Sequence, residues 1–511
     1  MKRALIIIAI ILLIAAVVGL VFLGGLMMNN YAETGSVFGS GFDLSGGFWE
    51  NIIGDEVLGG IDTSPRPTEP DNVFTGKTDE TDQELPSDES VFIYELLDDG
   101  TYAVKIDRTV SEDGILRIPD SLNGKPVTVV KSSAVSEADK TSAIKEVIIP
   151  DSVTTIEPKA FAIFENLEKV VLGNRVTTIG DAAFNDCRKL KSINLPDSLQ
   201  YIGVAAFQSC RGLQNIVLPK SLTTIGSYAF QDCIALSSIV IPDSIETIEE
   251  HSFSYCASLE SVTLGKGVKK IKDNAFYECT ALSEIILNEG LEEIGLSAFA
   301  ASAVTSIHIP SSVTYVQPNF LSSQNLNSIT VDPQNAKYHA ANNCLIKTEY
   351  KTLVRGSNTS VIPSDGSVEV IGNFAFYDLT LSEITIPETV IHIMPYAFEN
   401  CTSLTKVNWH DNIQAIGINT FYGCSSLGEI DFPENLTTLD GNFSNCTSLH
   451  TVNLSKNIQG IGARTFYGCE SLKTINYDGT KEEWNAVGIS PEWKNKNIHF
   501  TVVCTDGEIE Y

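Results

Sequence analysis

Basic residues are scarce in this sequence. Its 511 residues include 34 Lys and Arg against 64 Asp and Glu, which gives a formal net charge of −30. Binding to a nucleic-acid backbone or to anionic lipid headgroups needs clustered Lys and Arg, whereas an acidic surface repels both. We therefore predict no nucleic-acid partner and interpret the acidic excess as a source of solubility.

The motifs of common catalytic and metal sites are also missing. The seven His residues form no H-x-x-x-H pair, and the sequence contains no G-x-S-x-G, no G-x-x-x-x-G-K-[ST] and no calcium-loop pattern. We therefore predict no enzyme, no cofactor and no metal site. One alternative stays open, because a carbohydrate-active enzyme would need only a cleft with paired carboxylates outside any repeat.

A long apolar run occurs at the N-terminus. Lys2 and Arg3 precede 25 uncharged residues, 4–28, which form about 37 Å of helix at 1.5 Å per residue and are long enough to span a bilayer. The positive-inside rule then places the C-terminal bulk outside the cell. The alternative is a signal peptide cleaved near Tyr31-Ala32. We predict a single-pass membrane anchor.

The segment after the apolar run, residues 29–90, is rich in Gly, Ser, Pro and acidic residues. Pro stiffens such a chain, like charges extend it, and little apolar area is available for burial. We predict a disordered linker. Phe48-Trp49 with Ile52-Ile53 could instead form a short juxtamembrane helix.

What the sequence has in abundance is a repeat. Phe recurs at thirteen positions, mostly 23 residues apart: 161, 184, 207, 230, 253, 276, 299, 320, 376, 398, 421, 443 and 466. Cys follows three residues after nine of them, at 187, 210, 233, 256, 279, 401, 424, 446 and 469, which accounts for nine of the eleven cysteines. These positions define one structural unit that is copied along the chain.

One unit predicts two short extended segments. Ile193 and Leu195 alternate with Asn194, Pro196 ends this strand, and Ile202 belongs to a second extended corner before Phe207. Strands this short cannot bury their apolar faces alone, so successive units must stack about 4.8 Å apart in a parallel ladder. We predict a mostly β solenoid of about 13–14 turns with the Phe row inside.

The repeat consensus, L-x-x-I-x-I-P-x-S-V-x-x-I-G-x-x-A-F-x-x-C, resembles the BspA-like, Treponema-type leucine-rich repeats of bacterial surface proteins over 144–475. The resemblance implies a cap at each end and a hairpin insertion at about 332–360. The predicted parts are a cytoplasmic tip (1–3), a transmembrane signal anchor (4–28), an acidic linker (29–90), an N-terminal cap (91–143), the solenoid (144–475) and a C-terminal cap (476–511).

The cysteine row has no predicted chemistry. Four units carry Phe164, Ser302, Ser323 and Leu379 in place of Cys, so the position accepts apolar or small side chains. A spacing of about 4.8 Å also exceeds the Cβ separation of about 3.8 Å in disulfides, and a straight row cannot supply four converging metal ligands. We predict buried thiols. Cys344 and Cys504 lie off the row, and their pairing stays open.

The outward residue of the first strand forms one stripe along the solenoid. Its first part is mostly β-branched and apolar, and we predict a binding stripe at Ile148, Val171, Asn194, Val217, Val240, Thr263, Ile286 and His308. Strand propensity alone is the competing explanation for Val and Ile there.

The family resemblance implies an adhesin-like function. We expect a membrane-anchored extracellular protein that binds a protein or glycan ligand at a cell surface. The alternative is a structural or sensory ectodomain of the cell envelope without a host ligand. Neither reading requires a cofactor.

Overall fold

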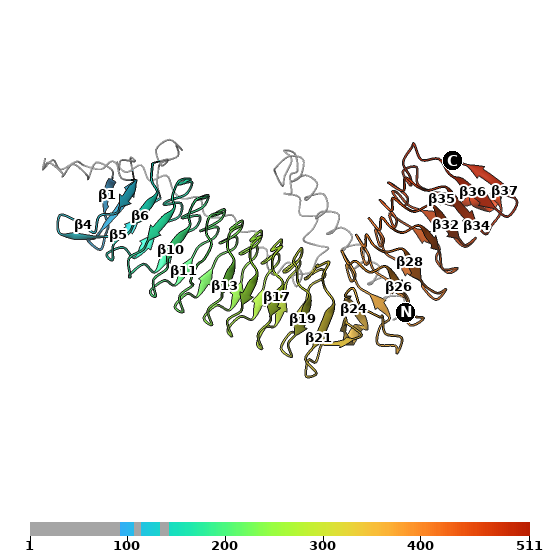
Figure 1. Ribbon diagram of the computed structural model, residues 1–511, viewed down its shortest axis with the longest axis horizontal. Helices are drawn as coiled ribbons and strands as arrows, with labels where there is room; N and C mark the ends of the chain where they lie inside the picture. The colour runs from blue at the N-terminus through green and yellow to red at the C-terminus, as the bar shows by residue number, and fades with distance from the viewer. Residues whose placement is uncertain (1–91, 107–113, 133–142) are drawn as a thin grey trace. The chain divides into compact units, whose positions relative to one another are not determined.

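The computed structural model describes residues 92–106, 114–132 and 143–511, all of which belong to one compact unit. They form a mostly β, parallel solenoid of about 17 turns with a period of about 23 residues (Figure 1). This count exceeds the predicted 13–14, because turns near both ends and at the insertion join the stack without the Phe that marks the repeat. The fold class itself is confirmed.

The predicted membrane anchor, residues 4–28, and the predicted linker, residues 29–90, lie outside the described residues. Among the residues that the structure describes, no helix combines the length and the apolar character needed to cross a membrane.

A first row of short strands carries the L-x-x-I-x-I segment of each turn. These strands are β3 (Ile115–Arg117), β6 (Glu146–Ile148), β8 (Lys169–Val171), β10 (Ser192–Asn194), β13 (Ser238–Val240), β15 (Ser261–Thr263), β17 (Glu284–Ile286), β19 (Ser306–Ile309), β21 (Ser328–Val331), β26 (Glu383–Thr385), β28 (Lys406–Asn408), β30 (Glu429–Asp431), β32 (Thr451–Leu454), β34 (Thr474–Tyr477) and β36 (Thr501–Cys504). The row is divided into several sheets. Within each sheet neighbouring strands of the row pair in parallel and in register, so that Val262 lies opposite Ile285. Equivalent residues therefore stack from turn to turn.

A second row of strands runs along the next side of each turn. It comprises β5 (Lys125–Val130), β7 (Thr155–Ile156), β9 (Thr178–Ile179), β11 (Tyr201–Ile202), β12 (Thr224–Ile225), β14 (Thr247–Ile248), β16 (Lys270–Ile271), β18 (Glu293–Ile294), β20 (Tyr315–Val316), β24 (Thr352–Arg355), β25 (Val370–Ile371), β27 (His392–Ile393), β29 (Ala415–Ile416), β31 (Thr438–Leu439), β33 (Gly460–Ile461) and β35 (Gly488–Ile489). All strands of this row except β5 and β24 have two residues. In most of these the second residue is buried, because alternate residues point to opposite faces.

The ladder Phe residues form a buried spine between the rows. All thirteen are at most 1% exposed. Phe253, Phe276 and Phe299 stack with ring centroids 5.4 and 5.5 Å apart and ring planes 7° apart. Offset stacking of this kind adds to the free energy gained from burial. The predicted inward orientation of the Phe row is confirmed.

Most of the Phe turns bend through two left-handed residues, which the sequence did not reveal because few of them are Gly. Ala182 (φ 52°) and Asp186 (φ 58°) flank Phe184 in this way. The bend lets the Phe184 N–H donate to the carbonyl of Ala206 in the next turn, at 2.8 Å. Each Phe turn is thereby hydrogen-bonded to its neighbour, although it contains no regular strand.

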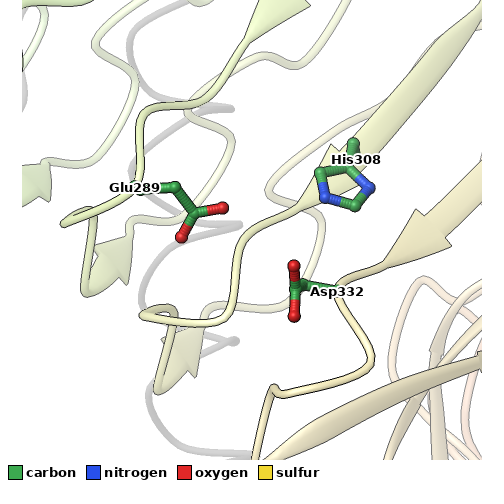
Figure 2. A group of neighbouring side chains, drawn as sticks. All are labelled: Glu289, His308 and Asp332. Carbon is green, nitrogen blue, oxygen red and sulfur yellow. The ribbon is translucent and has the colours of Figure 1, made fainter.

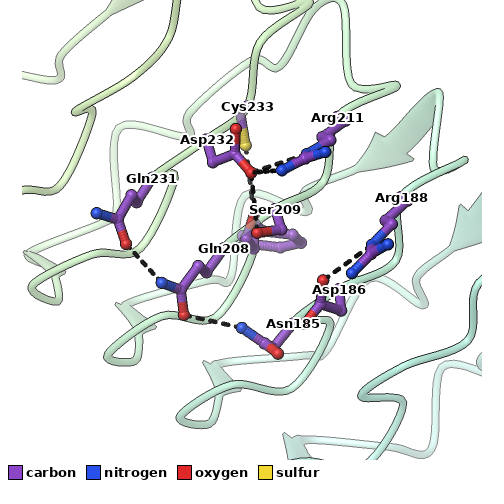
Figure 3. Close-up of polar contacts among 10 residues, drawn as sticks. Asn185, Asp186, Arg188, Gln208, Ser209, Arg211, Gln231, Asp232 and Cys233 are labelled. Atoms are coloured by element: carbon purple, nitrogen blue, oxygen red, sulfur yellow. Dashed lines mark hydrogen bonds and ion pairs between the residues drawn. The ribbon is translucent and has the colours of Figure 1, made fainter. Parts of the chain in front are cut away.

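Outward side chains on these turns also form rows. Asn185 donates from Nδ2 to Oε1 of Gln208 at 2.9 Å, and Gln208 donates in turn to Gln231 (Figure 3). In the adjacent row Ser209 Oγ donates to Asp232 at 3.1 Å. These polar side chains are therefore bonded to equivalent residues of neighbouring turns.

All eleven cysteines are free and buried, which for the nine cysteines of the row confirms the prediction of buried thiols. Cys344 and Cys504, whose pairing the sequence left open, are both free thiols. Burial raises the pKa of Cys187 to about 12. The thiolate needed for metal binding or redox work is thus disfavoured in the folded protein.

The segment between β21 and β25 leaves the repeat. It forms an antiparallel hairpin of β22 (Tyr338–Ala341) and β23 (Cys344–Lys347), followed by a 3-10 turn (η2, Thr348–Tyr350) and β24. The chain then rejoins the solenoid, where β24 pairs in parallel with β25. Buried Arg355 donates from Nη1 to the carbonyls of Phe374 and Tyr377, at 3.2 and 3.0 Å, and so occupies acceptors at the start of the resumed array.

Additional elements lie at the two ends. At the start β1 (Phe92–Leu96) pairs antiparallel with β2 (Tyr102–Ile106), and β4 (Ser121–Leu122) pairs antiparallel with β5. At the end the helix α3 (Lys481–Ala486) buries Trp484, and β37 (Gly507–Glu510) pairs antiparallel with β36. Such elements cover the open ends of a ladder, which would otherwise invite further pairing.

Candidate functional site

The predicted stripe lies on the outer face of the first row of strands, and its central part is exposed and apolar. Val217, Ile286 and Val240 are 82%, 67% and 63% exposed. Thr263 lies between Val240 and Ile286 in the same row. These four residues occupy successive turns about 4.8 Å apart. We call these four residues, Val217, Val240, Thr263 and Ile286, the apolar stripe.

Two serines and one glutamate border the apolar stripe, a feature that the sequence did not predict. The residue two positions earlier in each strand also points outward, and it is Ser238, Ser261 and Glu284 beside Val240, Thr263 and Ile286. Serine is too short to cover Val240 or Thr263, and Ile286 is 67% exposed although Glu284 lies beside it. The apolar stripe is therefore accessible to a flat partner surface.

The predicted residues before the apolar stripe have a different character. Ile148 and Val171 are only partly exposed. Asn194 is used internally, since its amide accepts from the N–H of Leu172 at 2.8 Å and donates to the Leu172 carbonyl at 3.0 Å. In regular turns the N–H equivalent to that of Leu172 donates to a backbone carbonyl instead. The Ile241 N–H, for example, donates to the carbonyl oxygen of Thr263.

The side chain of Asn194 marks an interruption of the first row. The next turn, residues 215–218, contains no strand, and the row resumes at β13. Val217 belongs to this irregular turn, which accounts for its high exposure. The apolar stripe therefore begins where the ladder hydrogen bonding is locally broken.

In the second half of the solenoid the same outward row is polar and bonded to itself. Asn453 donates to Glu429 at 3.1 Å and to Asp431, and Asn476 donates to Asn453 at 2.6 Å. Asn408 likewise donates to Glu383 and Thr385. These groups have partners within the array, whereas the apolar stripe exposes hydrocarbon to water. The contrast favours the first half as the binding face.

At the end of the stripe the structure groups three potential metal ligands, which the sequence analysis did not predict. Ligand atoms of Glu289, His308 and Asp332 all lie within 4.8 Å of one another (Figure 2). They come from the three successive turns of β17, β19 and β21. Because the three residues are 19 and 24 positions apart in the chain, no local motif could have revealed the group.

Two hollows bear on the enzyme alternative. The larger, about 580 Å³, lies near the C-terminus between Tyr467, Glu470 and His499 and contains one carboxylate. The smaller, about 220 Å³, lies on the repeat turns around Asp273 and Glu293. Neither matches the expected cleft, which would need paired carboxylates outside the repeat.

The comparisons with known proteins agree with this architecture. The family model described as BspA type leucine rich repeat region matches residues 136–260, 246–365 and 369–486, which together exceed half of the chain. Among proteins of curated function, no relative was found.

Two solved structures are similar over most of the chain. One is a leucine-rich repeat protein from Bacteroides ovatus, with 28% identity, a TM-score of 0.55, and coverage of 81% of this chain and 98% of the other. The second is described as a leucine rich cell surface protein from Faecalibacterium prausnitzii, with 26% identity, a TM-score of 0.53, and coverage of 80% and 98%.

Proposed function

Since this chain belongs to the BspA-type leucine-rich-repeat family, we propose that it is a bacterial cell-surface protein whose apolar stripe binds a protein ligand. The observation that carries the proposal is the exposure of Val217, Val240 and Ile286 in one row, at 82%, 63% and 67%. An exposed apolar row bordered by polar side chains is typical of an interaction surface. Solenoids present such rows as extended binding faces.

The acidic charge of the chain adds a constraint on the partner. A net charge of −30 repels acidic surfaces and raises the association rate with basic ones. A protein with an apolar patch in a basic surround fits the apolar stripe best. An adhesin-like role, in which this partner belongs to a host or neighbouring cell, is the form of the proposal that we favour.

Membrane attachment is part of the same proposal. It is supported by the uncharged run at residues 4–28 after Lys2 and Arg3 and by the similarity to the Faecalibacterium protein, which is described as a cell surface protein. The expected topology is a single pass with the solenoid outside. Protease added to intact cells should then digest the solenoid, and protection until lysis would contradict this topology.

The binding face can be tested with one double variant and one matched control. The full-length chain is applied to arrays of host-matrix proteins, cell-wall fractions and glycans. Val240→Asp with Ile286→Asp should abolish binding, because each change places a charge in the apolar stripe. Val361→Asp, which alters a residue 65% exposed in the insertion, should leave binding intact.

The outcomes separate the two functional readings. Binding to host-matrix proteins that the stripe variant loses supports the adhesin. Binding only to cell-wall fractions supports the structural or sensory envelope role instead. No binding above background, or equal loss in the Val361→Asp control, would argue against the apolar stripe as the site.

A further inference from the structure

We propose that Glu289, His308 and Asp332 form a binding site for a first-row divalent metal ion such as Zn²⁺. This proposal does not depend on the protein partner proposed above. It lies on the outer face at the end of the apolar stripe, where β17 and β21 lead into Glu289 and Asp332 and β19 carries His308 (Figure 2).

The donor set selects the class of metal. One imidazole nitrogen and two carboxylate oxygens suit zinc and its first-row neighbours, whereas Ca²⁺ and Mg²⁺ prefer oxygen ligands alone. Three protein ligands around zinc leave a fourth position for water or another donor. The exposure of Glu289 and His308 would leave that position open to solvent or to a carboxylate of a bound molecule.

A threonine hydroxyl holds the imidazole in an orientation suited to coordination. Nδ1 of His308 lies 2.9 Å from Oγ1 of Thr330, and these two residues face each other across the β19–β21 pair. Metal-binding histidines usually donate one ring N–H to an oxygen acceptor, a carboxylate, a carbonyl or a water, which leaves the other nitrogen free for the ion. Oγ1 of Thr330 is the oxygen in that place here. Here that arrangement leaves Nε2 of His308 as the ligand atom.

The two carboxylates are positioned but not neutralised. Glu289 accepts from Ser311 Oγ at 3.2 Å, and Asp332 accepts from the N–H of Gln334 at 2.7 Å. Within the described part of the chain, neither carboxylate forms an ion pair with a Lys or Arg. Two neighbouring negative charges repel each other, and a divalent cation between them would remove that repulsion.

The ligand atoms need only a small movement to coordinate. Around a tetrahedral zinc ion with bonds of about 2.1 Å, donor atoms lie roughly 3.4 Å apart. The atoms here are within 4.8 Å of one another. Exposed side chains can close this difference by changing rotamer, so that the backbone of the three turns stays in place.

Calorimetric titration of the full-length chain with Zn²⁺ tests the site. The wild-type chain should bind one equivalent that His308→Ala weakens by about tenfold or more. Asp332→Asn and Glu289→Gln should each weaken the same equivalent.

His450→Ala is the matched control. His450 is also exposed and its Nδ1 also lies 2.9 Å from a threonine hydroxyl, that of Thr451, but it is not part of the carboxylate group. This variant should bind Zn²⁺ like the wild type. Co²⁺ loading adds a second readout, since a site of nitrogen and oxygen ligands gives no thiolate-to-cobalt charge-transfer band and so excludes the cysteines.

Three results would overturn the proposal. The first is the absence of Zn²⁺ binding by the wild-type chain. The second is equal Zn²⁺ binding by the wild type and His308→Ala. The third is tight Ca²⁺ binding that persists in His308→Ala, which would identify a general acidic surface.

Discussion

The thiol of Cys187 donates a hydrogen bond to the carbonyl oxygen of Phe161 in the preceding turn, at 3.2 Å. The other eight cysteines of the row repeat this contact at 3.1 to 3.3 Å. Each thiol therefore fills a buried space and also bonds one turn to the next. The cysteine row is a structural device. Ser323, at the same repeat position, donates from Oγ to a different acceptor, the Val304 carbonyl, at 2.8 Å.

The first prediction concerns this contact. Cys233→Ala should lower the free energy of unfolding by about 2 kcal/mol, because it leaves a small cavity and removes the donor to Phe207. Cys233→Ser keeps a donor and should cost less than Cys233→Ala. Denaturant unfolding of both variants provides the comparison, and a serine variant less stable than the alanine variant would show that the hydrogen bond is unimportant.

The second prediction tests the aromatic spine. Phe276 is fully buried between Phe253 and Phe299. Phe276→Ala should cost about 3 to 5 kcal/mol, since it leaves a cavity and breaks two ring stacks. Thermal unfolding followed by circular dichroism measures the loss. Unchanged unfolding would contradict the packing described for the spine.

The third prediction uses the left-handed turns. Ile163 has φ 65° and is 51% exposed, so a β-branched side chain sits in a backbone region that favours glycine. Ile163→Gly should raise the free energy of unfolding by about 1 kcal/mol through release of this strain. The same change at Ile234, which is 40% exposed and has no positive φ, should destabilise the protein. Destabilisation at both sites would refute the strain argument.

The fourth prediction concerns pH. Desolvation raises the pKa of Glu399 from 4.5 to about 7. Below pH 4.5 the group is protonated in both states and costs nothing. As the pH rises from 4.5 to 7 the unfolded chain loses this proton first, so the folded state loses up to about 3 kcal/mol.

Replacing Glu399 by Gln removes this titration. The stability of Glu399→Gln relative to the wild type should therefore increase between pH 4.5 and pH 7 and level off above it. Urea unfolding at pH 5 and pH 8 measures the difference. Glu470→Gln, at an exposed position, serves as the control and should show no such trend. An equal trend in both variants would trace the effect to net charge instead.

The sequence alone determined the repeat and its inward rows. Phe161 to Phe466 and the nine cysteines share one period, and in a solenoid residues one period apart must stack on the same face. The fold class, the buried Phe spine and the outward stripe follow from that periodicity. The number of turns did not follow, because turns without the Phe marker still join the stack.

Only the tertiary structure decided what the outward residues do. Asn194 bridges to the backbone of Leu172, and Val217 lies in a turn without a strand, although both occupy the same repeat position. Glu289, His308 and Asp332 converge from different positions of three turns. The period fixes the face on which a side chain emerges, but side-chain rotamers and local breaks in the ladder fix which side chains meet.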